Sequence, residues 1–376
     1  MDLALTVDQK TFASTTRSFL DKNNPVSSVR DLASAPESFD RSWWTKGAEL
    51  GWAAMLVPEE LGGGSISGEG VRDLAMIAEE HGRVVAPGAL LPVNVVLAGL
   101  VEAAADDDGH TDEIEGLLAG QLLGTWAVYE PGAQWAPLAP ATTALADGEG
   151  FVLDGVKDRV EIGEQADLLL VTAATAEGVS QFLVPTDTPG LTVTSSWSLD
   201  LSRRFAEVRL EGVRVPASAV VGRLGEAAPL IERQLQVALV LQVAELCGGL
   251  EQVFAFTTQW AFDRYSFGRP LASYQALKHR FADMKTWIEA CQATSGEAAR
   301  AVQDRSDDAA ELVSVAKSYV ASRAVEIIQD CVQMHGGLGV TWEHDLHLYL
   351  RRATVDRALY GTPEDHRRRI ADIIKL

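Results

Sequence analysis

The sequence predicts an α+β protein, mostly α, with three parts in succession. Up to about residue 120 the apolar residues recur at helical spacing, and from about 121 to 222 they form short runs between turn residues. From about residue 225 the helical spacing returns in much longer segments. We therefore expect an N-terminal all-α domain (1–120), a middle antiparallel β-barrel or sheet domain (121–224) and a C-terminal four-helix bundle (225–376).

The individual elements follow from the same periodicities. The N-terminal helices are expected at 6–20, 37–50, 68–81 and 94–104, and the strands at 122–128, 151–155, 167–173, 181–185, 191–195 and 206–210. The long helices are expected at 226–264, 273–301, 307–334 and 342–359. The first of these is apolar nearly all round between Val237 and Leu250, which predicts a helix at the centre of a bundle.

Composition excludes several classes of protein. A formal net charge of −21 argues against a nucleic-acid partner, because the phosphate backbone would be repelled. The N-terminus lacks an uninterrupted signal-peptide core, and we expect a cytoplasmic protein that does not use a membrane. Cys247, Cys291 and Cys331 lack CxxC spacing and are expected to be small buried side chains in a reducing compartment.

One informative segment begins at Arg264 and reads Arg-Tyr-Ser-Phe-Gly-Arg-Pro. Gly268 can adopt the left-handed conformation that ends a helix, and Pro270 prevents its resumption. A second segment begins at Gln333, where Gln-Met-His-Gly-Gly-Leu-Gly follows a predicted helix. Its glycines let backbone N–H groups approach a ligand closely, and Thr341 is expected to cap a helix that begins at Trp342.

These two segments, in a chain ordered helices, β domain, helices, resemble the acyl-CoA dehydrogenases, flavoenzymes that desaturate acyl thioesters. The resemblance covers nearly the whole chain. It implies that an arginine at position 264 meets the FAD pyrophosphate across a subunit interface, where a planar donor fork suits two phosphate oxygens. The implied FAD-binding residues are Arg264, Ser266, Phe267, Gln275, Gln333, Gly336, Gly337, Thr362 and Glu364, with Glu130, Pro131 and Val160 in the β domain.

Two clusters of charged or metal-ligating residues have simpler interpretations. His335, Glu343, His344, Asp345 and His347 lack HExxH spacing and a fourth ligand, and the family uses no metal, so no metal site is expected. The basic residues near the C-terminus are interpreted as a solvated helix face rather than an anion site. They are Arg351, Arg352, Arg357, Arg367, Arg368 and Arg369.

The β domain departs from the family's pattern. Where the family has T-E-P-x-A-G-S-D, this chain has the segment Tyr129 to Trp135, which keeps Glu130 and Pro131 and loses the serine. After the G-x-K turn that ends at Lys157, the family's aromatic platform is replaced by Arg159, and a small hydroxyl residue by Glu161. A carboxylate there would disfavour an anionic reduced flavin.

Dehydrogenation of an acyl-CoA requires a carboxylate that removes the α-proton. The family places this glutamate either before the G-T of its Y-E-G-T segment or on the first bundle helix. Here those two positions hold Tyr360 and Ala238, neither of which ionises at neutral pH. Glu232 and Glu245 lie six and seven residues from Ala238, and Glu245 is two turns away, too far to serve without realignment. No catalytic base is identified, and Glu245 and Asp365 are the first residues to mutate if a relocated base exists.

Three functions remain open. The first choice is an FAD-dependent acyl-CoA dehydrogenase subunit that lacks the base and pairs with a homologous subunit, as in actinobacterial steroid side-chain catabolism. The second is a homo-oligomeric dehydrogenase with a relocated base. The third is a non-enzymatic CoA-ester or protein-binding module that has lost flavin.

Overall fold

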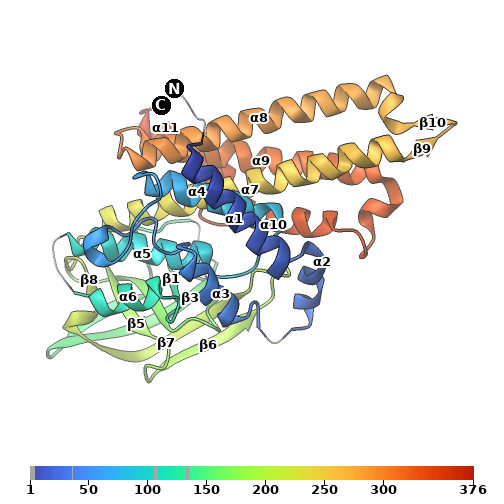
Figure 1. Cartoon of the computed structure of the whole chain (residues 1–376). Helices are drawn as coiled ribbons and strands as arrows, with labels where there is room; N and C mark the ends of the chain where they lie inside the picture. The colour runs from blue at the N-terminus through green and yellow to red at the C-terminus, as the bar shows by residue number, and fades with distance from the viewer. Residues whose placement is uncertain (1–4, 36, 106–108, 133–134) are drawn as a thin grey trace.

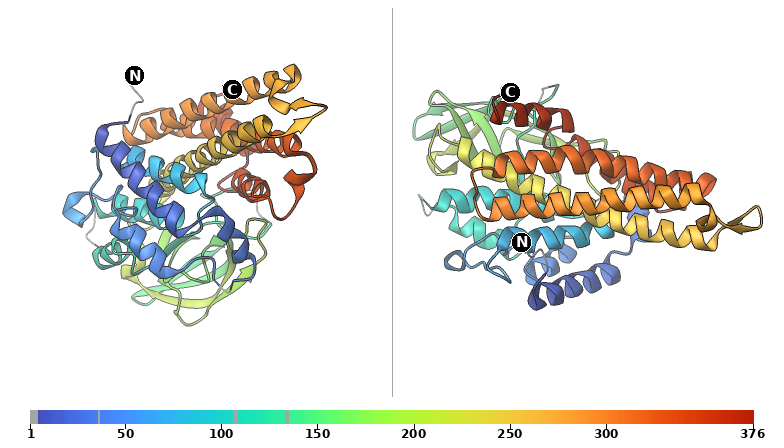
Figure 2. Two further views of the ribbon diagram at one scale, coloured as in Figure 1. Left: turned by 45° about the vertical axis from the view of Figure 1, so that its right-hand side comes forward. Right: turned by 90° about the horizontal axis from the view of Figure 1, so that it is seen from above.

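Helices, a sheet and longer helices follow one another along the chain (Figure 1). The computed structural model describes residues 5–35, 37–105, 109–132 and 135–376. The N-terminal helices and the sheet lie against one end of the long C-terminal helices, whose other end projects away from both (Figures 1 and 2). This arrangement agrees with the predicted fold class.

Helices form the first part of the chain. They are α1 (Val7–Asn23), α2 (Val26–Val29), α3 (Arg41–Glu49), α4 (Gly70–Arg83), α5 (Leu90–Ala104) and α6 (Thr111–Leu118). Helix α1 begins as predicted because Thr6 and Gln9 form a reciprocal capping box. Helix α5 is buried on nearly all sides, which agrees with its uniformly apolar sequence.

The middle part is a single sheet with the order β6-β7-β3-β2-β4-β5-β8, and β1 pairs with β4. Its strands are β1 (Gly124–Ala127), β2 (Thr143–Asp147), β3 (Gly150–Glu161), β4 (Leu168–Ala174), β5 (Val179–Pro185), β6 (Leu191–Ser196), β7 (Phe205–Pro216) and β8 (Val220–Val221). The sheet is not purely antiparallel, because β1 and β2 each pair with β4 in parallel. Parallel neighbours need a crossover, which local strand patterns do not reveal.

The C-terminal part is built on three long helices and two shorter ones. They are α7 (Ala228–Asp263), α8 (Gln275–Gln303), α9 (Ala309–His335), α10 (Leu346–Ala358) and α11 (Pro363–Ile373). A short hairpin joins α7 to α8, with β9 (Tyr265–Ser266) paired to β10 (Arg269–Pro270). The 3-10 helix η5 (Gly336–Val340) follows α9.

The predicted start of the fourth long helix at Trp342 is wrong. Helix α10 begins at Leu346, and the Thr341 hydroxyl instead donates a 3.0 Å hydrogen bond to the carbonyl of Leu338. The glycine-rich segment continues as a 3-10 turn, which delays the helix by four residues.

Helix α7 lies at the centre of the molecule, as its apolar sequence predicts. It packs against α4, α5, α8 and α9. By length and composition it could cross a membrane, but 78% of its most apolar window is buried inside the protein. A central bundle helix explains this composition fully. Cys247, Cys291 and Cys331 are buried free thiols on α7, α8 and α9.

Candidate functional site

The Arg264 segment forms an exposed tip at the projecting end of the long helices. Arg264 is the first residue after α7, and its guanidinium lies 5.7 Å from the centre of the Trp260 ring. Phe267 and Gly268 both have positive φ values, 51° and 78°, and make the tight hairpin turn. The Phe267 side chain is 96% exposed, so it packs on nothing within this chain.

The Gln333 segment lies next to this tip. The Trp260 ring stacks on His335 with 5.2 Å between ring centres, and its indole N–H donates to the carbonyl of Met334. Arg264, Trp260 and His335 therefore connect the two segments that the sequence singled out. Gln333, Gly336 and Gly337 are exposed, and the space beside both glycines is open.

The remaining tip residues have different exposures. Gln275 is exposed at the first turn of α8, and Ser266 is half-buried, with its carbonyl accepting a 2.8 Å hydrogen bond from the Tyr274 hydroxyl. The tip points away from the chain's own sheet in every ribbon view (Figures 1 and 2). Its arginine, amides and glycines are therefore exposed to solvent and lie away from the sheet of this chain.

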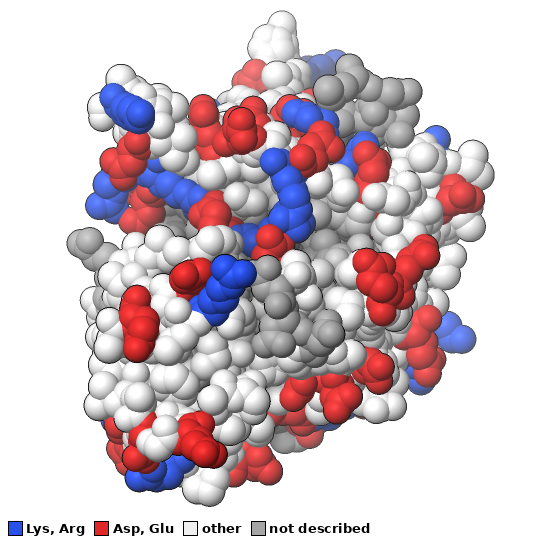
Figure 3. Space-filling model, turned by 90° about the vertical axis from the view of Figure 1, so that its left-hand side faces the viewer, with Lys and Arg blue, Asp and Glu red and all other residues white. Residues whose placement is uncertain are grey.

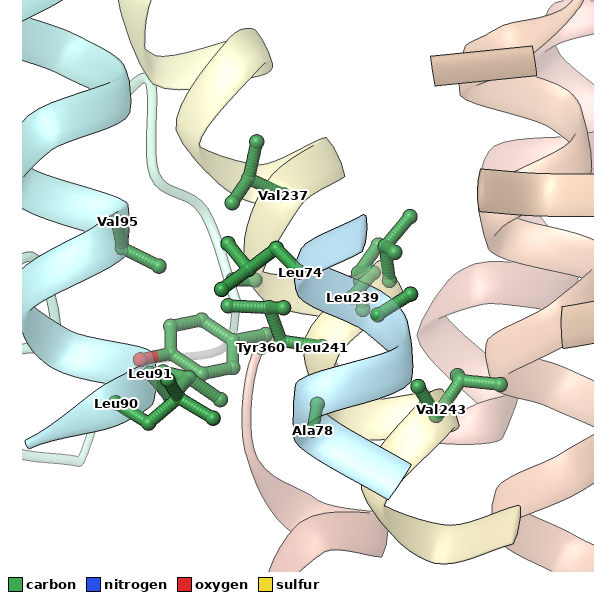
Figure 4. Packing of buried hydrophobic residues seen from close by; sticks show 14 of the residues in the cluster. Leu74, Ala78, Leu90, Leu91, Val95, Val237, Leu239, Leu241, Val243 and Tyr360 are labelled. Atoms are coloured by element: carbon green, nitrogen blue, oxygen red, sulfur yellow. The ribbon is translucent and has the colours of Figure 1, made fainter. Parts of the chain in front are cut away.

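The predicted base position lies at the opposite end, where the sheet meets the helices. Tyr360 is buried, with its ring parallel to that of Trp126 at 6.1 Å and close to Tyr129 and Trp135. Figure 4 shows Tyr360 among the buried apolar side chains of the central cluster. Burial, reinforced by the charge of Glu161, raises the pKa of the Tyr360 phenol far above its usual range. The phenol therefore stays protonated and cannot serve as a base.

The backbone around Tyr360 is held at three points. Its N–H donates to the Tyr129 hydroxyl, and its carbonyl accepts a 2.8 Å hydrogen bond from Nε2 of His366. The preceding carbonyl, of Leu359, accepts a 2.7 Å hydrogen bond from the buried ammonium of Lys317. Tyr360 itself has a φ of 58°, which a tyrosine rarely adopts. The tyrosine is thus a packed part of the core.

Neither alternative carboxylate is available as a base. Ala238 is fully buried on α7, and Glu245, two turns further on, is ion-paired to both Arg203 and Arg352. Asp365 accepts hydrogen bonds from the Thr362 N–H and hydroxyl and pairs with Arg368.

Glu245 belongs to a buried ionic network between the sheet and the helices. Arg203 also pairs with Asp356 and, at 3.2 Å, with Glu161, while Arg352 also pairs with Asp200. Burial raises the pKa of Glu161 despite Arg203, and its second carboxylate oxygen has no hydrogen-bond partner among the described residues. The network is a cross-link between β3, the segment before β7, α7 and α10.

Arg352 corrects the interpretation of the C-terminal arginines as a solvated face. Its side chain is buried, whereas Arg357, Arg367 and Arg368 are exposed. A signal for this was present, because Leu348, Arg352 and Asp356 follow one another at i, i+4 spacing on α10. Sequence reasoning also missed the buried partners Asp200, Arg203, Lys317 and Asp356, which come from three separate segments: the one before β7, α9 and α10.

The β-domain residues have mainly structural contacts. Glu130 accepts hydrogen bonds from Lys157 at 2.8 Å and from the backbone N–H groups of Ala141 and Thr142. Partial burial acts to raise the pKa of Glu130, but these donors outweigh it and lower the pKa to about 2. Pro131 follows Glu130 in the loop after β1, and Val160 is fully buried in the sheet core. Residues 133 and 134 lie outside the described residues.

A flavin ring does not fit at this junction as it is packed. At the position of the family's aromatic platform, Arg159 lies over the Tyr129 ring at 4.3 Å. Glu161 is committed to Arg203, and Tyr360 with Trp126 fills the interior beside it. Placing a planar ring there would require the aromatic cluster and the ionic network to move together.

Two further predicted contacts lie beside this junction and not at the tip. Thr362 is the N-cap of α11, accepting a 3.2 Å hydrogen bond from the N–H of Asp365. Glu364 is exposed and pairs with Arg367 at 3.2 Å. As for metals, no group of three or more His, Cys, Asp or Glu residues with ligand geometry occurs in the part of the chain that the structure describes.

His366 gives the junction a pH dependence that can be measured. Burial lowers its pKa to about 4, although its bond to the Tyr360 carbonyl acts in the opposite direction. The unfolded chain therefore binds a proton, near its ordinary pKa of ~6.5, before the folded chain does. Stability is full above this pH and falls by ~1.4 kcal/mol per pH unit as the pH decreases toward 4.

His366→Gln, which keeps a donor near the Nε2 position, is expected to reduce this fall. The check is the thermal midpoint of both proteins at about pH 7 and about pH 5. His81 is fully buried on α4 with a pKa also near 4 and will leave part of the slope in place. An unchanged slope in the variant would mean that His366 is not buried in its neutral form.

With this geometry in place, comparison with known proteins gives the family. Three family models match in order: the acyl-CoA dehydrogenase N-terminal domain at residues 6–118, the middle domain at 125–213 and the C-terminal domain at 228–375. The chain is 30% identical over 362 residues to acyl-CoA dehydrogenase IpdE2 of Mycobacterium tuberculosis, covering 95% of this chain and 94% of the relative. The chain belongs to the acyl-CoA dehydrogenase family, an enzyme family of flavoprotein oxidoreductases.

Solved structures extend this result. The ChsE4-ChsE5 complex from Mycobacterium tuberculosis contains a chain that is 25% identical, with a TM-score of 0.87 and coverage of 100% and 99% of the two chains. The Tcur3481-Tcur3483 steroid acyl-CoA dehydrogenase gives 26% identity and a TM-score of 0.87, covering 98% and 97%. A Mycobacterium smegmatis protein described as a possible acyl-CoA dehydrogenase shares the fold, with a TM-score of 0.92 at 24% identity and coverage of 100% and 99%.

Proposed function

We propose that this chain is the base-lacking subunit of a heteromeric, FAD-dependent acyl-CoA dehydrogenase. In this proposal its projecting tip completes an FAD site whose flavin ring and catalytic glutamate belong to a homologous partner subunit. The substrate class is an acyl-CoA thioester, which the partner desaturates between Cα and Cβ. A steroid-derived acyl group is the favoured kind, and the compartment is the cytoplasm.

The observation that carries the proposal is the contrast between the two ends of the molecule. At the junction, Tyr360 fills the base position and Glu161 is held by Arg203, so the chain lacks both the base and room for the ring. At the tip, Arg264, Gln333 and the open glycines are exposed and point away from the chain's own sheet. Such a chain can contribute its tip to an FAD site. A homologous partner would then have to supply the junction that holds the flavin ring and the base.

The surface beside the tip is suited to such a partner. Phe262, Tyr265 and Phe267 are exposed, next to a hollow of about 510 Å3 lined mainly by apolar groups that include Ala261, Pro270 and Phe281. Exposed aromatic and arginine side chains are typical of residues that contribute most to protein interfaces. Two of the similar solved structures are described by a pair of protein names, ChsE4-ChsE5 and Tcur3481-Tcur3483.

Assembly is the first test. Mixed with its partner, the chain is expected to form an α₂β₂-like particle with one FAD for each pair of chains, because only one of the two junctions accepts the ring. Mass photometry with flavin quantitation measures both quantities. One FAD per chain in a homotetramer would contradict the proposal and favour a self-sufficient enzyme, whereas a colourless protein that binds no homologue would favour a non-enzymatic module.

The role of Arg264 can be tested in the assembled complex. Arg264→Ala is expected to weaken FAD retention by ~1.5–3 kcal/mol, the usual cost of a lost hydrogen bond to a charged group. The measurement is the FAD dissociation constant of the heteromer by flavin fluorescence. Arg269→Ala is a matched control, because Arg269 lies in the same hairpin and its guanidinium packs 3.9 Å from the centre of the Tyr274 ring. Equal FAD affinity in the Arg264 variant and the wild type would refute the role.

A further inference from the structure

A polar cavity of about 430 Å3 lies away from both the tip and the junction. One wall is the segment from Met55 to Val71, which leads into α4, and the other wall comes from α7 and the end of α8. The second wall contributes Arg233, Gln303 and Arg305. The size is within the range of cavities that hold small molecules.

Arg233 is unusual in a chain with a net charge of −21. It projects from the first turns of α7 into the lining of this cavity, and its guanidinium donates a 2.8 Å hydrogen bond to the carbonyl of Val302. Within the described ranges, its guanidinium forms no ion pair. Burial first, and then the charge of Arg305, lowers the pKa of Arg233 to about 10.

The nearby carboxylate is already occupied. Glu102 forms a two-point ion pair with Arg305, at 2.9 and 2.7 Å, so a single carboxylate serves two neighbouring guanidinium groups. Figure 3 shows one face of the molecule, on which most Lys and Arg side chains lie beside Asp or Glu side chains. Glu59, at the rim of the cavity, is exposed to solvent. The second wall, which contributes Arg233 and Arg305, therefore carries an excess of positive charge.

Gln303 adds a neutral donor to the same wall. Its Oε1 accepts a 2.8 Å hydrogen bond from the N–H of Val71 in the first turn of α4, which fixes the orientation of the amide. Its Nε2 group has no hydrogen-bond acceptor among the residues that the structure describes. Arg233 and Gln303 thus offer several unused N–H donors to one cavity.

We propose that this cavity binds a phosphate group, either free or carried by a small metabolite. A phosphate dianion would pair with Arg233, relieve the repulsion between Arg233 and Arg305, and accept from Nε2 of Gln303. The site is separate from the acyl-CoA dehydrogenase site and does not depend on the proposed function. Its occupant stabilises the contact between the N-terminal helices and α7.

The probes are inorganic phosphate and adenosine monophosphate, added to the full-length protein and measured by isothermal titration calorimetry and thermal shift. We expect saturable binding at millimolar concentrations or below, with an increase in the thermal midpoint that follows occupancy. Tighter binding of the nucleotide would identify a phosphorylated metabolite as the natural ligand, and equal binding would identify free phosphate.

Two variants make the test specific. Gln303→Glu keeps an acceptor for the Val71 N–H but places a carboxylate beside Arg233, and Arg233→Gln removes the charge. Both are expected to weaken phosphate binding at least tenfold, and Gln303→Glu should remain as stable as the wild type because a carboxylate favours a helix N-terminus. Arg209→Gln, on the exposed side of β7, is the matched control and should bind as the wild type does. Absence of saturable binding to the wild type, or unchanged affinity in both cavity variants, would overturn the proposal.

Discussion

Purified on its own and supplied with an artificial electron acceptor, this chain is expected to desaturate acyl-CoA esters ~10²–10⁴ times more slowly than a family member with a glutamate base. The reason is structural, because Tyr360 is packed and protonated where the base would be, and Ala238 fills the alternative position. The measurement is turnover of a panel of saturated acyl-CoA thioesters by the isolated chain. The same assay with the homologous partner added should restore the rate.

Robust turnover by the isolated chain would contradict this expectation and show that another carboxylate acts as base. Glu245→Gln and Asp365→Asn are then the variants to compare. Of the two, Asp365 is the less constrained, since Glu245 is buried between two arginines while Asp365 is half-buried and pairs with the exposed Arg368.

Removal of Arg203 is expected to have the largest effect on stability. Arg203→Met leaves Glu161, Glu245 and Asp356 buried with less compensating charge, and loss of one partner of a buried ion pair costs ~3–5 kcal/mol. Chemical or thermal unfolding of the purified variant measures this loss. The flavin content of the heteromer is measured separately. Lower stability with unchanged flavin content would show that Arg203 stabilises the fold without binding the cofactor.

The neighbouring strand β7 offers a control for this variant. Arg209→Ala removes a half-exposed pair with Glu207 and is expected to change stability by ~0–1 kcal/mol. If Arg203→Met is no less stable than Arg209→Ala, the buried network is not the cross-link between sheet and helices that its contacts indicate.

Local patterns were sufficient for most elements and for the tip. Helix α1 is predicted from apolar spacing alone, and the capping box of Thr6 and Gln9 that starts it involves only neighbours in sequence. The turn at Phe267 and Gly268 depends equally on neighbours in sequence. Such features depend on residues close in sequence, so local sequence patterns predict them without knowledge of the tertiary fold.

The junction could not be predicted in the same way, because its partners are distant in sequence. Arg203 meets Glu245 across 42 residues and Asp356 across 153, and Trp126 stacks on Tyr360 from another domain. Substitutions at Tyr360, Arg159 and Glu161 indicated a changed site. Only the structure shows that the Tyr360 ring stacks on Trp126 there and that Glu161 pairs with Arg203. The parallel pairing of β1 with β4 is a crossover of the same non-local kind.

The exposed tip has a consequence for the chain's life before assembly. In a newly made copy, Phe262, Tyr265 and Phe267 are exposed at the projecting end of the long helices. Exposed apolar surfaces of this kind bind chaperones, proteases and other copies of the chain. In the proposed heteromer, the supply of the partner would govern how long each copy survives. A cell that makes the two subunits in equal numbers would keep both, and one that makes an excess of this chain would lose the surplus to degradation.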